Sequence, residues 1–150
     1  MFRQCLRTSS TVDAPTIGNT GEWAPDIDRI VVSGPPSLSA AGARNAGVAQ
    51  TTADVVVFVD ADVAVRADAF TRLRAAFTAD PQLAAVYGSY DDSPADRGVV
   101  SAFRNLLHHH VHQANAGPAE TFWTGLGAVR RSSFHAVGGF DEARYPHPSI

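Results

Sequence analysis

The sequence predicts an α/β domain, a three-layer α/β/α sandwich in which helices cover both faces of a mostly parallel sheet. The first observation is an unbroken apolar run, 55–59, closed by Asp60 and Asp62, because a strand buried on both faces reads as a continuous hydrophobic segment. The second is the amphipathic helix that follows and the apolar strand after it, which is typical of a parallel strand–helix–strand unit. The third is size: 150 residues with 45% hydrophobic content suffice for one domain with a sizeable core.

The first part of the chain divides at about residue 25. Residues 1–25 are rich in Ser, Thr, Gly and Pro without a periodic apolar pattern, so we expect an irregular segment there and the domain over 26–150. A short strand is predicted over 27–32. Ser39 is a good N-cap for a helix running to about Gln50, and the small residues Ala43 and Gly47 in it predict close packing on the sheet.

The remaining elements follow the apolar run. A helix is predicted between Asp68 and Asp80, and a strand over 83–87. A second amphipathic helix is marked by Val99, Phe103, Leu106, Leu107 and Val111. A strand over 122–129 and a short helix over 132–137, stopped by Gly138 and Gly139, complete the pattern.

Composition excludes some classes of function. The net charge is −3 and lysine is absent, which argues against nucleic acid as a partner, because a phosphate backbone is held by clustered cations. The single cysteine, Cys5, predicts a reducing compartment. No apolar run has the length of a membrane helix or the form of a signal peptide, so we expect a cytoplasmic location.

The acidic pair that ends the apolar run is the main candidate site. Residues two apart in extended backbone point to the same side, so Asp60 and Asp62 can face one ligand. Ligands of open α/β sheets bind beyond the carboxyl ends of the strands. Two carboxylates there would suit Mg²⁺ or Mn²⁺ shared with a diphosphate. The alternative is that Asp60 caps the turn and Asp62 is solvated.

Several segments together resemble the inverting family-2 glycosyltransferases with the GT-A (Rossmann-like) fold. They are 43–47 (ARNAG), 57–62 (VFVDAD), 122–131 (FWTGLGAVRR) and 138–142 (GGFDE), so the resemblance covers about 30–150. It implies a nucleotide-sugar donor and assigns Asp60 and Asp62 to the divalent metal and the diphosphate. The donor base, the sugar and the acceptor, a carbohydrate or a lipid-linked molecule, stay open.

The resemblance also suggests substrate-binding residues. Arg44 and Asn45 would lie near the donor, although Asn45 can equally anchor a loop and Arg44 can lie on the surface. Trp123, with Gly125 and Gly127, would shape the sugar or acceptor pocket, since an aromatic face stacks on sugar rings and glycine permits close approach. The alternative for Trp123 is a core side chain on a strand.

The resemblance is incomplete at both ends. The opening strand and its acid-rich turn are matched only faintly by 11–16, with Asp13 the sole acid there, and the family's catalytic base lies beyond Ile150. Asp141 and Glu142 belong to a structural turn in the family. We therefore expect a partial domain that binds the donor; whether it transfers the sugar or is inactive as a fragment stays open, and an exposed sheet edge would favour self-association. A position at the inner face of a membrane stays open for full-length relatives.

Other functions are weighed against this one. His108 and His112 share a helix face and can hold a transition metal, although the sequence singles out no third ligand; the alternative is a polar face bordering the acceptor cleft. A haloacid dehalogenase-type phosphatase also ends a buried strand in Asp-x-Asp, but this chain has no lysine to complete such a site. A non-catalytic nucleotide-sugar-binding remnant is the third hypothesis.

Overall fold

The computed structural model describes residues 39–59, 63–94 and 98–145. In chain order these residues form α1 (Ala40–Ala49), β1 (Val55–Val59), α2 (Ala69–Ala79), β2 (Ala85–Tyr87), α3 (Val99–Ala114), β3 (Leu126–Arg130) and α4 (Arg131–Ala136). Every element predicted within these ranges is present, with bounds shifted by a few residues. The predicted irregular segment 1–25 and the predicted strand 27–32 lie outside the described residues.

The described sheet is antiparallel, so the prediction of a mostly parallel sheet was wrong. Its strand order is β1-β3-β2, and β3 pairs antiparallel with both neighbours. β1 and β2 therefore run in the same direction, as the strand–helix–strand pattern predicts, but β3 lies between them. The reason is that the chain leaves β2 at Tyr87 and returns at Leu126 to the same edge of the sheet, where a new strand can only run back against the other two.

β1 is covered on both faces, as its unbroken apolar sequence predicts, with one face buried and the other partly buried. Val56 and Phe58 belong to a cluster on the α1 side, while Val55, Val57 and Val59 pack against a cluster on the α2 side. This alternation is the two-residue period of extended backbone. Among the described strands, however, β3 and not β1 is the central one.

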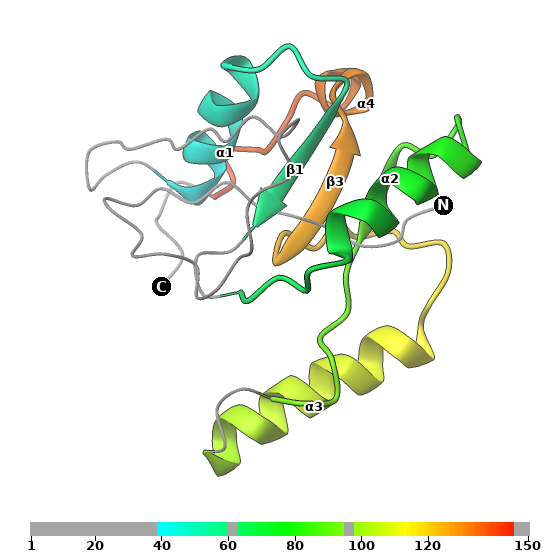
Figure 1. The fold of residues 1–150 in the computed structure, drawn as a ribbon. Helices are drawn as coiled ribbons and strands as arrows, with labels where there is room; N and C mark the ends of the chain where they lie inside the picture. The colour runs from blue at the N-terminus through cyan, green and yellow to red at the C-terminus, as the bar shows by residue number, and fades with distance from the viewer. Residues whose placement is uncertain (1–38, 60–62, 95–97, 146–150) are drawn as a thin grey trace.

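Helices cover both faces of this sheet (Figure 1). On one face, Leu73 and Phe77 of α2 pack with Leu83, Val86 and Ala128. On the other face, Val48 of α1 and Phe134 of α4 pack with residues of all three strands. The predicted α/β/α layering is therefore present around the short sheet.

Two local signals in the sequence act as predicted. The hydroxyl of Ser39 accepts a hydrogen bond of 3.0 Å from the amide of Gly42 and caps α1. Gly138 and Gly139 follow α4 with φ of 80° and 77°, a left-handed conformation that favours glycine and ends a helix.

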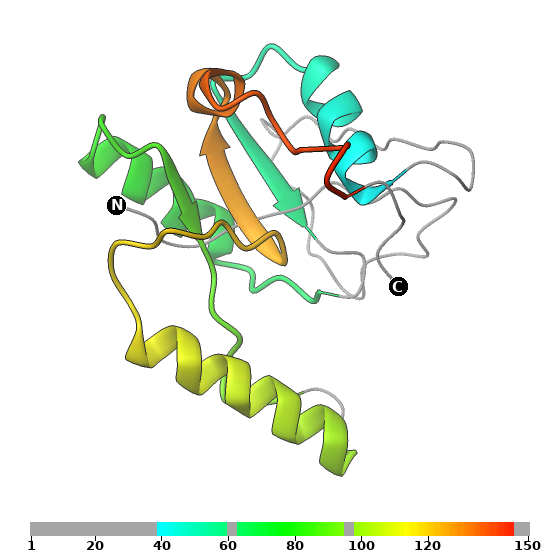
Figure 2. The same cartoon turned by 180° about the vertical axis from the view of Figure 1, so that it is seen from behind.

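α3 differs from the other helices because none of its residues is buried. It lies apart from the sheet in views from opposite sides (Figures 1 and 2). Its apolar stripe is exposed, with Val99 at 85% and Phe103 at 65%. The amphipathic pattern correctly predicts the helix, but the apolar face does not pack on the core.

Candidate functional site

A cavity lies at the edge of the sheet where β1 and β2 end and β3 begins. The register places Val59 opposite Leu126, and Tyr87 opposite Gly127, at this edge. The cavity has a volume of about 420 Å³, and its walls come from 63–69, 88–93, the inner face of α3 and 123–126. It is therefore built by segments that follow or precede the ends of all three strands, where ligands bind in open α/β sheets.

The predicted metal-binding pair, Asp60 and Asp62, lies outside the described residues. Its flanking residues are described: Val59 ends β1, and Val63 lines the cavity. The chain thus leaves the sheet at the edge that carries the cavity and enters the cavity wall immediately after the pair. Asp13 also lies outside the described residues.

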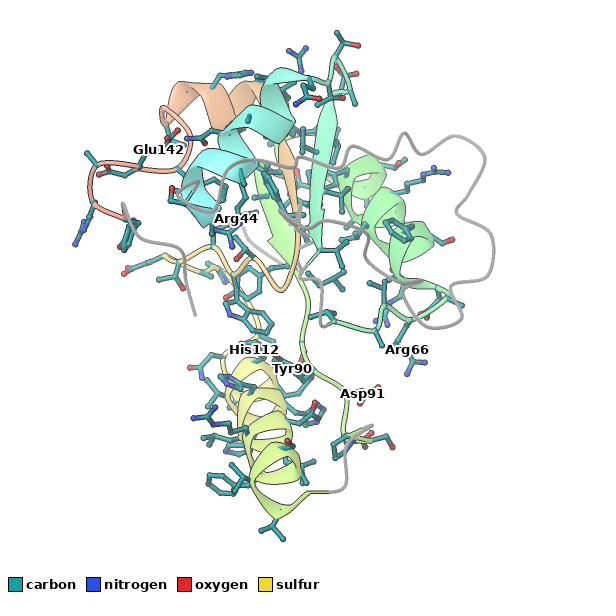
Figure 3. All side chains as sticks on the ribbon, turned by 90° about the vertical axis from the view of Figure 1, so that its left-hand side faces the viewer. Arg44, Arg66, Tyr90, Asp91, His112 and Glu142 are labelled. Carbon is teal, nitrogen blue, oxygen red and sulfur yellow. The ribbon has the colours of Figure 1, made fainter. Side chains whose placement is uncertain are left out.

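Aromatic rings join α3 to the rest of the domain beside this cavity. Trp123 has its ring centroid 5.1 Å from that of Tyr90, 4.8 Å from His112 and 6.0 Å from His108, over which it is stacked. Tyr90 in turn stacks on His108 at 5.4 Å. We call these four residues the ring cluster; Figure 3 shows its Tyr90 and His112 where α3 meets the domain.

Two hydrogen bonds complete the attachment of α3. Nδ1 of His109 lies 2.7 Å from the carbonyl oxygen of Tyr90, so it carries the proton and donates, because a carbonyl can only accept. The Asn105 amide donates to the carbonyl of Asp91 at 2.8 Å. Because Nδ1 donates to this carbonyl, Nε2 is the ring nitrogen that can accept a hydrogen bond from a ligand, and His109 lines the cavity.

His112 is held in its neutral form. Burial lowers the pKa of His112 below its ordinary value of 6.5, and the nearby His108 and His109 lower the pKa further. Its buried Nδ1 makes no hydrogen bond to the described residues. A second proton on this ring would place a charge among aromatic rings and other histidines.

The histidines of α3 do not form a metal site with a third ligand among the described residues, since no group of three His, Cys, Asp or Glu side chains converges there. His108 and His112 lie 6.1 Å apart between ring centroids and contact Trp123 and Tyr90. Their contacts are those of a packing surface between α3 and the domain.

Charged side chains line the outer part of the cavity. On one wall, Asp68 lies 3.4 Å from Arg66 and 3.8 Å from Arg72, and all three are largely exposed. Asp91 and Asp92 lie on another wall. Exposed ion pairs of this kind are weak and exchange easily with solvent or ligand. The outer part of the cavity can therefore contact cationic or anionic groups of a ligand.

Trp123 and the predicted glycines lie at this edge of the sheet. Trp123 and Gly125 line the cavity. A Cβ at Gly125 would come within 2.9 Å of the Trp123 ring, so the glycine lets the ring lie directly on the backbone. Gly127 is buried in β3 between Phe58 and Tyr87. Trp123 thus lines the cavity and packs against α3, but it precedes β3 and is half-buried, so the alternative of a core side chain on a strand was wrong.

Arg44 and Asn45 of α1 contact the turn after α4 instead of the cavity. Asn45 Nδ2 donates to the Phe140 carbonyl at 2.9 Å and to Glu142 Oε1 at 2.7 Å, and its Oδ1 accepts from the Phe140 amide at 2.9 Å. Arg44 is 8% exposed, with its guanidinium 5.2 Å from the centre of the Phe140 ring. Asn45 makes the contacts of a loop anchor, and Arg44 lies buried and not on the surface.

Both acids of this turn accept hydrogen bonds that hold the turn in place. Glu142 accepts from Asn45, and the Asp141 carboxylate accepts from the Arg144 amide at 2.9 Å. Figure 3 shows Glu142 on the α1 side of the domain, away from Tyr90 and Asp91. The arrangement is that of the structural turn that the resemblance implies.

Sequence reasoning did not single out Tyr90, Asn105 or His109 as site residues. Tyr90 could have been found, because it follows β2 as closely as Val63 follows β1 and so lies at the same edge. His109 could not, since its orientation depends on which face of α3 meets the domain.

Comparison with known proteins identifies one family. The family model described as Glycosyl transferase family 2 matches residues 18–138. A search of the curated proteins gave no match, and a search of the solved structures gave none. The match does not support the phosphatase alternative. None of the described helices combines the length and apolar content that crossing a membrane requires.

Proposed function

We propose, because this chain belongs to glycosyl transferase family 2, that it transfers a sugar from a nucleotide-sugar donor to a hydroxyl group of a carbohydrate or lipid-linked acceptor. The observation that carries the proposal is the position of the cavity. It opens at the edge where β1 and β2 end, and its wall begins at Val63, directly after the Asp60-Ala61-Asp62 segment. Substrates bind at this edge in open α/β sheets.

In this proposal Asp60 and Asp62 hold a Mg²⁺ or Mn²⁺ ion. Carboxylate oxygens are the ligands these hard cations prefer, and a pair two residues apart beyond a strand can face one ion. When bound, the cation offsets the charge of the donor diphosphate and so stabilises the leaving nucleotide. The carboxylates would otherwise repel that diphosphate.

The cavity beyond the pair is proposed to hold the reacting sugars. Its aromatic members, Tyr90 and Trp123, can contact the apolar face of a pyranose ring. His109 can accept a hydrogen bond from a sugar hydroxyl through Nε2, because its Nδ1 is occupied by the Tyr90 carbonyl. Asn105 and Gln113 add planar amides to the same wall.

The donor site is tested by calorimetric titration of the chain with UDP and with GDP, each with and without Mn²⁺. We expect binding that needs the metal, prefers one base and disappears in the Asp60→Asn, Asp62→Asn double variant. Asp54→Asn is the matched control, since Asp54 is an exposed acid at the opposite end of β1. A folded protein that binds neither nucleotide in the presence of Mn²⁺ would contradict the proposal.

Turnover is tested separately with a panel of UDP- and GDP-linked sugars, by following release of the free nucleotide with and without added glycosides. Release that depends on Asp60 and Asp62 supports an enzyme. Metal-dependent binding without any release would favour the non-catalytic remnant instead, so the two assays distinguish a missing donor site from a missing catalytic group.

A further inference from the structure

We propose that α3 docks on an anionic lipid surface through its outer face. The large apolar side chains of this face are Val99, Val100, Phe103, Leu106, Leu107 and Val111, and every one of them is at least 44% exposed. We call them the outer face. Six such side chains on a helix of 16 residues form a contiguous apolar surface of the kind that marks an interaction site.

The outer face is opposite to the side of α3 that holds the helix in place. The attached side carries Asn105, His108, His109 and His112, which contact the segments around Tyr90 and Trp123. With 3.6 residues per turn, these positions lie about half a turn from Phe103 and Leu107. The helix is therefore fixed to the domain by polar and aromatic contacts, and the apolar side chains on its other side are exposed. The ribbon of α3 lies apart from the sheet in both views (Figures 1 and 2).

The charge of α3 matches an anionic surface. Arg104 is the one Lys or Arg residue of the helix, and the helix contains no acid. Arg104 follows Phe103 and borders the outer face, where its guanidinium could reach lipid phosphates while the apolar side chains enter the acyl boundary. At 16 residues, α3 is suited to lie along a bilayer surface rather than to cross it.

A second copy of the chain fits the outer face less well. A helix of 16 residues is about 24 Å long and about 10 Å wide. Two such faces packed on each other would cover a footprint of only about 240 Å², whereas stable complexes bury about 800 Å² of accessible surface per partner. A bilayer does not need that area or a complementary shape, because each side chain partitions into it individually.

Docking of α3 would also bring the cavity close to the lipid surface. The inference drawn from this placement rests on the proposed function. The cavity lies on the attached side of α3, where His109 and Gln113 line it. A surface-bound helix would therefore keep the cavity within about one helix diameter, about 10 Å, of the lipid headgroups. This placement favours a lipid-linked acceptor over a free sugar.

The test is co-sedimentation of the full chain with vesicles of phosphatidylcholine alone and of an equal mixture of phosphatidylcholine and phosphatidylglycerol. No nucleotide sugar is present, so the result is independent of transfer activity. We expect binding to the mixed vesicles, and a loss of roughly a hundredfold in the Phe103→Asp, Leu107→Asp double variant, because each apolar side chain contributes about tenfold on burial. Arg104→Glu should weaken binding to the mixed vesicles more than to the neutral ones.

Val137→Asp is the control, because Val137 is an apolar residue that is 78% exposed, after α4 and away from the outer face. It should bind as the unaltered chain does. Failure of the unaltered chain to sediment with mixed vesicles would overturn the proposal, as would equal binding by the double variant. A dimer that the double variant abolishes, seen by light scattering without any vesicle binding, would overturn it in favour of a second copy.

Discussion

The side chain of Asn45 forms hydrogen bonds with both backbone groups of Phe140, an arrangement we call the clamp. Its amide nitrogen donates to the Phe140 carbonyl and its amide oxygen accepts from the Phe140 amide, each at 2.9 Å, across 95 residues of chain. The ring of Phe140 then packs on Phe58 of β1 with a centroid distance of 5.5 Å. The clamp thus connects α1, the strand that leads to Asp60, and the turn after α4.

Replacing Asn45 should loosen this turn. Asn45→Ala removes three hydrogen bonds, one of them to the Glu142 carboxylate, and leaves partly buried backbone groups of Phe140 unpaired. We expect a loss of about 2 kcal/mol in the free energy of unfolding, measured by urea denaturation. Gln50→Ala on the same helix is the control, because Gln50 is exposed and its amide bonds only within α1. Equal effects of the two substitutions would show that the clamp adds no stability.

Gly138 and Gly139 allow the cost of a side chain to be separated from the cost of a backbone conformation. Both have positive φ, 80° and 77°, so alanine at either position should cost about 1 kcal/mol of stability. A Cβ at Gly138 meets nothing within 4 Å, whereas one at Gly139 would lie 2.8 Å from Asn45 Oδ1. Gly139→Ala should therefore be clearly the more destabilising in thermal denaturation. If the two variants melt together, the clamp yields to the added methyl group without cost.

Acid should release α3 from the domain. Burial, followed by the neighbouring His108 and His109, lowers the pKa of His112 in the folded state, so the unfolded state binds protons more readily. The stabilisation by neutral His112 is complete above pH 6.5 and is lost as the pH falls through the lower, folded-state pKa. Amide hydrogen exchange in α3, measured above and below pH 6.5, should show protection that declines on acidification.

The control for this prediction is His112→Phe, which keeps an aromatic ring beside Trp123 and Tyr90 but cannot be protonated. Protection of α3 in this variant should depend less on pH. His110→Phe alters an exposed histidine of the same helix and should leave the profile unchanged. An identical pH profile in His112→Phe and the unaltered chain would assign the effect to another group.

Two substitutions of His109 should distinguish the roles of its two ring nitrogens. Asparagine can place an amide donor near the position of Nδ1 and keep the bond to the Tyr90 carbonyl, while glutamine can place a polar group near Nε2. If Nε2 receives a sugar hydroxyl, His109→Asn should raise the KM for the acceptor about tenfold or more and leave nucleotide binding unchanged. Steady-state kinetics and calorimetry measure the two effects. A changed affinity for the nucleotide alone would place His109 in the donor site.

Local signals account for the elements that the sequence predicted well. Ser39 caps α1, the run 55–59 forms a strand covered on both faces, and Gly138 and Gly139 end α4. Each of these depends on residues within a few positions of one another, through a cap, a two-residue period or a backbone preference. The motifs 43–47 and 138–142 lie on or directly after these elements, and the sequence also identified the family.

Contacts between distant segments account for the features that the sequence did not predict. The apolar stripe of α3 indicated a helix but not its orientation, because the ring cluster and the bond from His109 to Tyr90 hold the opposite face. The tertiary structure likewise decided that Asn45 contacts Phe140, and that β3 enters between β1 and β2. Hydrophobic periodicity states which side chains favour burial, whereas strand order and helix orientation depend on which surfaces meet after the chain returns. By itself the sequence thus determined the local elements and the family of this protein, and only the tertiary structure decided the direction of the sheet, the cavity wall and the outward face of α3.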